Sequence, residues 1–403
     1  MIAMRSTLSL ILLFALTTAC GIFNSLDYYK VREKSDIVTK DFYKEMSFLK
    51  NRPVILIPVE IGGRTYNFIF DTGAAVSVIS KELAGELGLE EEADVMIHDS
   101  KGHNQELIVS LIDTIDIAGV QFIDIAAVVV DWSENSVISC VSPAGIIGNN
   151  LIRHANWRVD YKNHQLVVSD SSLHIDGMHY VEMQSPEGRP FISLKADSLE
   201  IAHCLLDLGS GGSLDLSREM AEDWNWKKYP YTRDIDGSSE GLFGSKLDTT
   251  INVKIDSLSI GGYTLYETVV DIEKKSGSKI GTKVLEQSIL NLDYSNSRVG
   301  FLPYDSIPTY GHLKEGGFAV LMDSSGFYIS SITEDAALWQ RGVRYGDRVK
   351  SLNGKQPADF GGFCEFVEWL LDKENRPQEF TLVMENDPQN EIIVGKEYLW
   401  SNE

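Results

Sequence analysis

The sequence predicts a mainly β protein with two duplicated halves and a smaller C-terminal α+β unit. First, a turn of the type Asp-x-Gly follows an apolar run twice, at Asp71 and at Asp207. Second, the pairs Ile147-Gly148 and Ile280-Gly281 lie 133 residues apart (280 − 147), close to the 136 residues between the two aspartates (207 − 71). Third, helical periodicity is confined to short segments. A unit of about 130 residues is too long for a solenoid repeat and suits a whole lobe.

The local patterns within each half favour hairpins and short capped helices. Residues 54–61 predict a strand that ends at Gly62-Gly63, and residues 66–70 predict the returning strand. Two adjacent glycines between such strands are a hairpin signal. Ser80 and Ser217 each precede a short helical pattern, which predicts a serine N-cap at both places.

This arrangement resembles the aspartic peptidases, specifically the bacterial retropepsin-like and pepsin-like group. The matching parts are the Asp71-Thr72-Gly73-Ala74 turn after an apolar strand and the later Gly145-Ile146-Ile147-Gly148 segment. In that family the second segment threads behind the catalytic turn of the same lobe. Members are either homodimers of one lobe or single chains of two. The resemblance implies two β-barrel lobes in this chain, at residues 47–170 and 171–305.

The chemistry of such a pair needs neither a metal nor a cofactor. Two carboxyl groups held a few ångström apart cannot both ionise cheaply, so they share a proton. The ionised acid takes a proton from the water that attacks a peptide carbonyl, and the protonated acid donates to the carbonyl oxygen and the leaving nitrogen. We therefore expect hydrolysis of a peptide or protein substrate. The catalytic residues would be Asp71 and Asp207, supported by Thr72, Gly73 and Gly209.

The second motif departs from the family pattern at Leu208, where the family has Thr or Ser. The family uses both hydroxyls to brace the dyad, so here the brace would be one-sided. Four alternatives stay open: weak activity, a changed role for Asp207, an inactive protease-like scaffold that binds peptides, and pairing of Asp71 with the Asp71 of a second molecule. Residues 99–103 and 236–239 are candidate tips for the hairpin flap that closes the cleft in this family.

The region 310–403 does not continue the repeat. Apolar strands at 318–322 and 327–332, a Gly-Asp turn, an Asn-Gly turn and a helical stretch at 363–371 follow one another in an order that resembles a bacterial PDZ domain. Such domains capture a peptide end by strand addition. Alternatively, this unit only packs against the lobes. The resemblance implies a C-terminal peptide as ligand, in a groove beside Gly326, Phe327, Tyr328 and Ile329.

The N-terminus carries an export pattern. Arg5 and the apolar stretch 8–19 match a secretory signal, since twelve apolar or small residues are too few to span a bilayer comfortably. The segment that ends at Cys20 resembles a bacterial lipobox. This predicts removal of residues 1–19, a lipid anchor on Cys20 and a tether at 20–46, in a periplasm-facing protein of the cell envelope. Ordinary signal cleavage and an uncleaved anchor are the alternatives.

The net charge limits the possible partners, and the cysteine content limits the possible disulfides. The formal net charge of −23 argues against nucleic acid and against broad contact with anionic lipid. The eight histidines show no paired metal spacing, so we expect no metal site. Apart from Cys20, the cysteines are Cys140, Cys204 and Cys364, an odd number that forbids full pairing. We expect core thiols, with a Cys140–Cys204 bridge left open.

Overall fold

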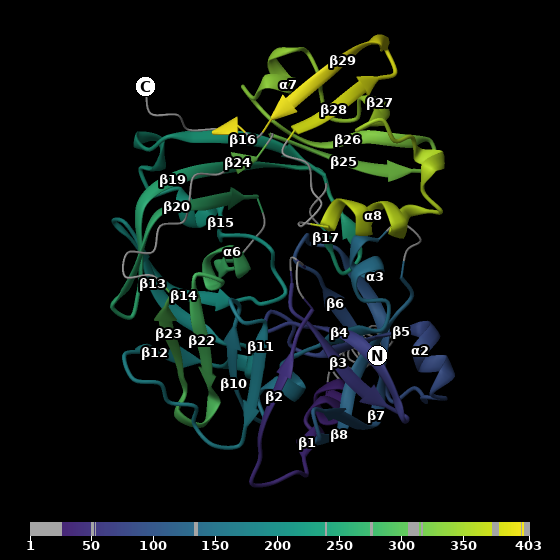
Figure 1. Ribbon diagram of the computed structural model, residues 1–403. Helices are drawn as coiled ribbons and strands as arrows, with labels where there is room; N and C mark the ends of the chain where they lie inside the picture. The colour runs from purple at the N-terminus through teal and green to yellow at the C-terminus, as the bar shows by residue number, and fades with distance from the viewer. Residues whose placement is uncertain are drawn as a thin grey trace, which may run out of the picture.

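The protein is mainly β, as predicted (Figure 1). The computed structural model describes residues 26–49, 52, 54–132, 136–237, 240–274, 277–304, 314–315, 317–372, 379–395 and 397–398. The expected signal sequence and Cys20 lie outside these residues. In Figure 1 the first half of the chain forms the purple and blue body, the second the teal and green body, and the yellow-green C-terminal unit lies across both.

Six strands of the first half close into a ring. Their order is β3-β4-β9-β5-β8-β7, and β7 returns to β3. The β4–β9 and β5–β8 pairings are parallel and the others are antiparallel. The hairpin expected at Gly62-Gly63 joins β3 to β4, with positive φ at both glycines. The strands are β3 (Leu56–Ile61), β4 (Arg64–Phe70), β5 (Ser77–Ser80), β7 (Asn104–Ile117), β8 (Val120–Val130) and β9 (Gly145–Ile147).

A second ring of six strands follows the same order of pairings. It runs β13-β14-β21-β15-β20-β19, and β19 returns to β13. Its parallel pairings, β14–β21 and β15–β20, occupy the places of the two parallel pairings in the first ring. The strands are β13 (Phe191–Ala196), β14 (Leu199–Leu206), β15 (Leu214–Ser217), β19 (Asp248–Ile260), β20 (Tyr263–Glu273) and β21 (Lys279–Ile280).

An antiparallel sheet joins the two rings. Its order is β2-β11-β10-β22-β23-β12, and β10 meets β22 at its centre, where Arg158 faces Asn291. One apolar core runs through both rings and this sheet, and includes Phe70, Trp157 and Leu206. The strands are β2 (Tyr43–Ser47), β10 (Asn156–Asp160), β11 (Gln165–Ser169), β12 (His179–Gln184), β22 (Ser288–Asp293) and β23 (Arg298–Pro303).

Short helices follow several strands. Ser80 caps α2 by accepting from the N–H of Leu83, and Ser217 caps α5 by accepting from Met220, as predicted. The helices are α2 (Lys81–Glu86), α3 (Val137–Val141), α4 (Asn149–Ile152), α5 (Arg218–Ala221), α6 (Thr282–Leu285), α7 (Ala337–Gln340) and α8 (Phe363–Leu371). The remaining strands are β1 (Asp36–Ile37), β6 (Ala93–His98), β16 (Tyr231–Asp236), β17 (Glu240–Gly241), β18 (Gly244–Ser245), β24 (Lys314–Glu315) and β30 (Glu397–Tyr398).

The tether expected at residues 20–46 is wrong from residue 26 onward. A helix at 26–32 buries Tyr28 and Val31 against the first ring. Strand β1 then pairs with β8, and β2 forms one edge of the joining sheet. The segment folds because its apolar side chains have a core to enter. Within the described residues, no helix is long and apolar enough to cross a membrane.

The C-terminal unit has its own apolar core around Phe327, Phe366 and Leu382. The helix expected at 363–371 is present as α8. Strands β25 to β29 pair antiparallel in chain order. These strands are β25 (Phe318–Asp323), β26 (Gly326–Thr333), β27 (Arg348–Leu352), β28 (Glu379–Met384) and β29 (Asp387–Gly395).

The peptide groove expected beside Gly326, Phe327, Tyr328 and Ile329 is wrong. Phe327 and Tyr328 pair with β25 on one side and with β27 on the other. The N–H of Ile329 donates to Asp347, and its carbonyl accepts from Gly346. Strand addition needs unpaired backbone groups along an edge. Strand β26 is an interior strand, so it offers no such edge.

A strand pairing and a disulfide attach the C-terminal unit to the rings. Strand β16 of the second half pairs with β26, with Ile235 opposite Ile332. A disulfide joins Cys140 on α3 to Cys364 on α8. The expectation of core thiols is therefore wrong for these two cysteines, and so is the Cys140–Cys204 bridge; Cys204 is a buried free thiol. The partner of Cys140 lies 224 residues away, a distance that no local pattern reveals.

Candidate active site

The structure brings Asp71 and Asp207 together at the junction of the two rings. Each aspartate comes directly after a strand, β4 or β14. The N–H of Asp71 donates to the carbonyl of Ile147 (3.0 Å), and that of Asp207 donates to Ile280 (2.9 Å). These bonds fix each turn to the short strand that threads behind it. The two carboxyl groups are close enough for the charge of Asp207 to raise the pKa of Asp71.

Glycine is required on each turn because the opposite carboxyl group occupies the space beside it. A Cβ atom at Gly73 would lie 2.6 Å from Oδ1 of Asp207, and one at Gly209 would lie 2.5 Å from Oδ1 of Asp71. Real Cβ atoms do not approach a carboxylate so closely. Each glycine also donates its N–H to the aspartate of its own turn, at 2.6 Å for Gly73 and 3.0 Å for Gly209.

A one-sided brace joins the turns, as the sequence predicted. The hydroxyl of Thr72 donates to the carbonyl of Leu206 (2.6 Å) and accepts from the N–H of Leu208 (3.0 Å). Thr72 and Leu208 are both fully buried. The Leu208 side chain belongs to the apolar core and has no hydroxyl to return the contact. A single side chain thus supplies both hydrogen bonds across the junction.

The environment of Asp71 favours its protonated form. Burial, followed by the charge of Asp207, raises the pKa of Asp71 to about 8. The backbone donors Gly73 and Ala74 act in the opposite direction but do not offset these two causes. A buried carboxyl group beside a second carboxyl group keeps its proton near neutral pH, where an exposed aspartate is already ionised.

Sequence reasoning missed two asparagines behind the first turn. The Asn149 side chain donates to the carbonyls of Thr72 (2.7 Å) and Ala74 (2.8 Å). The Asn150 side chain accepts from the N–H and the hydroxyl of Ser77. Both asparagines are fully buried. Their position directly after Gly148, in the segment that the family threads behind its turn, was the available signal.

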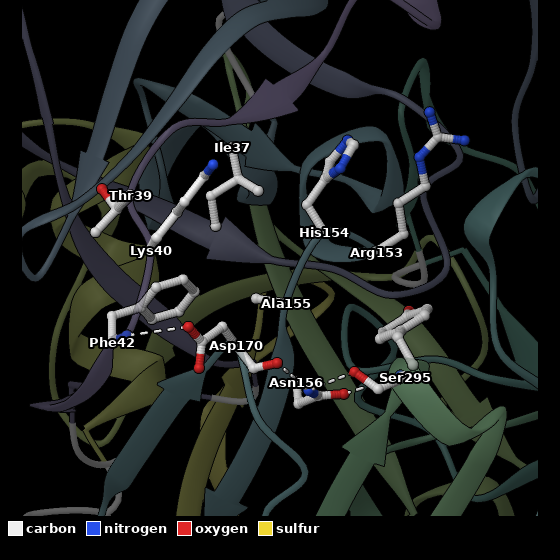
Figure 2. A pocket seen from close by; sticks show the side chains of 11 residues that line it. Ile37, Thr39, Lys40, Phe42, Arg153, His154, Ala155, Asn156, Asp170 and Ser295 are labelled. Atoms are coloured by element: carbon white, nitrogen blue, oxygen red, sulfur yellow. Dashed lines mark hydrogen bonds between the residues drawn. The ribbon is translucent and has the colours of Figure 1, made fainter.

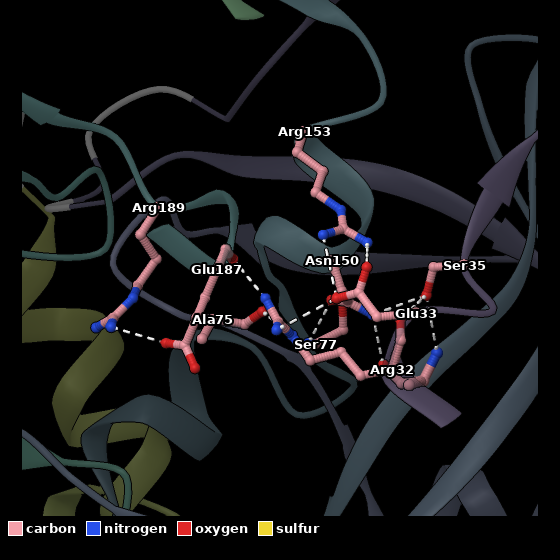
Figure 3. A network of polar contacts seen from close by, with 10 residues as sticks. Arg32, Glu33, Ser35, Ala75, Ser77, Asn150, Arg153, Glu187 and Arg189 are labelled. Atoms are coloured by element: carbon pink, nitrogen blue, oxygen red, sulfur yellow. Dashed lines mark hydrogen bonds and ion pairs between the residues drawn. The ribbon is translucent and has the colours of Figure 1, made fainter. Parts of the chain in front are cut away.

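A third missed residue is Arg32, which comes from the segment that the sequence assigned to a tether. Figure 3 shows its guanidinium between the first turn and the connection to the second ring. Its Nε donates to the carbonyl of Ala75 (3.3 Å), and Nη2 donates to that of Glu187. Only 2 % of Arg32 is exposed. It therefore ties the end of the Asp71 turn to the stretch that leads into the second ring.

The tip of the β6–β7 hairpin, expected as a flap, contacts the second half. The carboxylate of Asp99 accepts from the N–H of Phe243 (3.1 Å), on the turn between β17 and β18. Lys101 on the same tip lies 3.7 Å from Glu273. The other expected tip falls at 236–239, of which residues 238 and 239 lie outside the described part of the chain.

A separate cavity of about 320 Å³ lies where β1 leads into the joining sheet (Figure 2). Phe42 donates its N–H to Asp170 there, and the side chain of Asn156 contacts Ser295. Arg153 also lines it. Neither dyad aspartate belongs to this cavity, and it contains no pair of facing acids. Acid–base chemistry that needs two facing carboxyl groups is therefore expected at the junction of the two rings and not in this cavity.

Two aspartates on facing Asp-x-Gly turns, with an apolar-Gly strand behind each turn, resemble the arrangement of an aspartic peptidase. A comparison with protein-family models matches residues 57–151 to the aspartyl protease family. Residues 57–151 thus form an aspartyl protease domain, which contains Asp71 and the segment behind it. Asp207 lies outside the matched residues. A comparison with curated proteins finds no match to the chain.

Proposed function

We propose that the protein is an aspartic endopeptidase whose dyad is Asp71 and Asp207 of one chain. The observation that carries this proposal is the mutual approach of the two turns, in which each glycine leaves room for the opposite carboxyl group. The protease domain at 57–151 supports a peptide or protein substrate. Asp71 and Asp207 of the one chain lie beside each other's glycine turn, which supports a dyad within one chain over pairing with the Asp71 of a second molecule.

The two acids have different roles in this proposal. Asp71, with its raised pKa, holds the shared proton and donates it to the carbonyl oxygen of the scissile bond. Asp207 is ionised and takes a proton from the attacking water. That proton then passes to the leaving nitrogen as the C–N bond breaks, and one hydroxyl of the gem-diol intermediate returns its proton to Asp71, which restores the singly protonated dyad. The titration belongs to the pair, so activity requires the singly protonated dyad.

Peptide cleavage by single Asp→Asn variants tests this proposal. We expect Asp71→Asn and Asp207→Asn each to lose roughly 10²- to 10⁴-fold in kcat/KM on a peptide library, since each removes one acid–base group. Asp113→Asn, at an exposed position on β7, is the matched control and should retain activity. Full activity in either dyad variant removes that residue from the mechanism. Peptide binding without cleavage by the unmodified protein favours the scaffold alternative.

The C-terminal unit is proposed to be a PDZ-like domain that packs against the protease halves. The arguments are the β16–β26 pairing, the Cys140–Cys364 disulfide and the 2.6 Å ion pair between Arg52 and Glu368. Each of these links attaches part of the unit to the protease halves. A peptide-binding domain that moved freely would lack such links. Separate expression of residues 310–403 tests this role: a unit built for packing should lose stability without the rings.

The repeated strand order supports a duplicated origin of the two rings, which we propose with boundaries at 47–170 and 171–305. We also propose that the protein is a lipoprotein of the bacterial cell envelope, anchored at Cys20 and facing the periplasm. The Cys140–Cys364 disulfide supports an oxidising compartment. Metabolic labelling with a fatty acid, compared between the unmodified protein and Cys20→Ala, tests the anchor. Equal labelling of both would contradict it.

A further inference from the structure

The second ring carries a charged cluster where the first ring is apolar. On the first ring, Val78 on β5 pairs with Ile146 on β9. The corresponding pair on the second ring is Asp215 on β15 and Lys279 on β21. The difference continues on the next strand, where Val128 lies opposite Val78 but Asp271 lies opposite Asp215. The apolar residues form a buried cluster, whereas one of the charged residues, Lys279, lies close to the dyad.

Lys279 lies beside the second aspartate of the dyad. Its Nζ is 3.8 Å from Oδ2 of Asp207, 3.3 Å from Oδ2 of Asp215, and within hydrogen-bonding distance of the Ser210 hydroxyl (3.2 Å). The Lys279 side chain is 22 % exposed, and that of Asp207 is 13 % exposed. Asp215 holds the ammonium group at one side while the other side faces the dyad. At this range an ammonium favours the ionised form of a carboxyl group.

We propose that Lys279 is a positioning residue that assigns the two roles in the dyad, keeping Asp207 ionised and the shared proton on Asp71. This inference rests on the proposed peptidase function and deepens it. On the first ring, the uncharged Ile146 occupies the place equivalent to that of Lys279. The two acids thus differ in their surroundings although their backbone turns match.

The surroundings of Lys279 keep it charged. Burial alone would lower the pKa of Lys279, but the charges of Asp215, Asp207 and Glu273 outweigh burial and raise it above its usual range. Other charged groups face this cluster. The raised pKa of Asp271, caused first by burial and then by Asp215, favours its neutral form, and Lys283 opposes this shift. Lys101 and Asp236 act on Glu273 in opposite senses, and its pKa is also raised, mainly by burial.

The test compares pH–rate profiles of kcat/KM for the unmodified protein, Lys279→Met, Lys279→Arg and the double variant Asp215→Val/Lys279→Ile. The double variant copies the Val78–Ile146 pair, so it removes the ammonium without leaving the Asp215 carboxylate unpaired. The matched control is Lys254→Met, since Lys254 is also partly buried and pairs with Glu267. All variants are checked for folding by circular dichroism.

We expect the acidic limb of the profile to move to higher pH by about one to three units in Lys279→Met and in the double variant. The direction follows because the dyad without the ammonium takes up its second proton more readily. Lys279→Arg should restore the limb to within about half a unit, and Lys254→Met should leave it in place. An acidic limb that stays in place in the folded double variant overturns the inference.

A second readout separates this inference from the proposed function. Carboxyl ¹³C chemical shifts of labelled aspartate, followed against pH in the intact protein, report proton uptake without any turnover. If the unmodified protein cleaves no peptide, the proposed function is wrong. The titration still tests whether Lys279 affects the protonation of the dyad. A shift to higher pH of the midpoint at which the dyad takes up its second proton, in the double variant, supports the role of Lys279, and an unchanged midpoint contradicts it.

Discussion

The two rings have the same strand order but differ in the side chains around their Asp-x-Gly turns. The first turn has Thr72, which makes both bonds across the junction, and the second has the apolar Leu208. The first ring has Ile146 where the second has Lys279. The backbone pairings and the two glycines define the geometry, and they tolerate these exchanges. The exchanged side chains then give two acids of identical type different surroundings, which is what an acid–base pair requires.

The largest expected effect concerns the difference between the two acids themselves. The pKa of Asp71 rises from 3.8 to about 8 on folding. A carboxyl group with a raised folded-state pKa binds its proton more tightly when folded, so its contribution to stability is present at low pH and lost as the pH rises from about 4 to about 8. Asp71→Asn mimics the protonated acid, so it should remove this pH-dependent loss of unfolding free energy. The loss is on the order of 5 kcal/mol as an upper bound.

Urea denaturation at pH 4 and pH 8 measures this effect. The difference in unfolding free energy between Asp71→Asn and the unmodified protein should be larger at pH 8, in favour of the variant. Asp113→Asn, on the exposed surface of β7, serves as control and should show no such change. An Asp71→Asn difference that is equal at the two pH values would contradict the raised pKa.

The second comparison concerns how each ring holds the C-terminal unit. The second half of the chain contacts the C-terminal unit through the β16–β26 pairing. The first half contacts it through the Cys140–Cys364 disulfide and the Arg52–Glu368 ion pair. Cys140→Ser/Cys364→Ser should lower the unfolding free energy by about 2–5 kcal/mol, because the bridge closes a long loop. Arg52→Met should cost less than about 1 kcal/mol, because the carboxylate it contacts is largely exposed.

Thermal unfolding of the oxidised and reduced protein checks this prediction. The reductant should lower the midpoint of the unmodified protein and leave that of Cys140→Ser/Cys364→Ser unchanged. Cys204, the buried free thiol, provides an internal control, since Cys204→Ala should keep the sensitivity to reductant. Equal midpoints with and without reductant in the unmodified protein would show that the bridge does not support the fold.

The third comparison concerns the brace. Thr72→Val keeps the shape of the side chain but leaves two buried backbone groups, at Leu206 and Leu208, without their partner. We expect a loss of about 2 kcal/mol in unfolding free energy and a fall of roughly tenfold in kcat/KM. Leu208→Thr supplies the hydroxyl that the second turn lacks, and added to Thr72→Val it should recover part of the activity. No change in Thr72→Val would show that the turns hold without a brace.

The strand pattern, the N-caps and the hairpin at Gly62-Gly63 could be predicted because each depends on residues close together in the chain. The candidate dyad was also suggested by local signals, since Asp71 and Asp207 each stand in a recognisable turn. The groove at Phe327 was predicted wrongly because sequence patterns identify a strand but not whether it lies at an edge. The tether was predicted wrongly because residues 26–46 gain their structure only from the core they enter.

The sequence by itself determined the repeated turns, their glycines and the missing hydroxyl at Leu208. Only the tertiary structure decided that Lys279 faces Asp207, that Arg32 ties the first turn to the second ring, and that Cys140 meets Cys364. The physical reason is that a turn or a cap is set by short-range backbone bonding, whereas an ion pair or a disulfide between distant residues exists only once the core has packed them together.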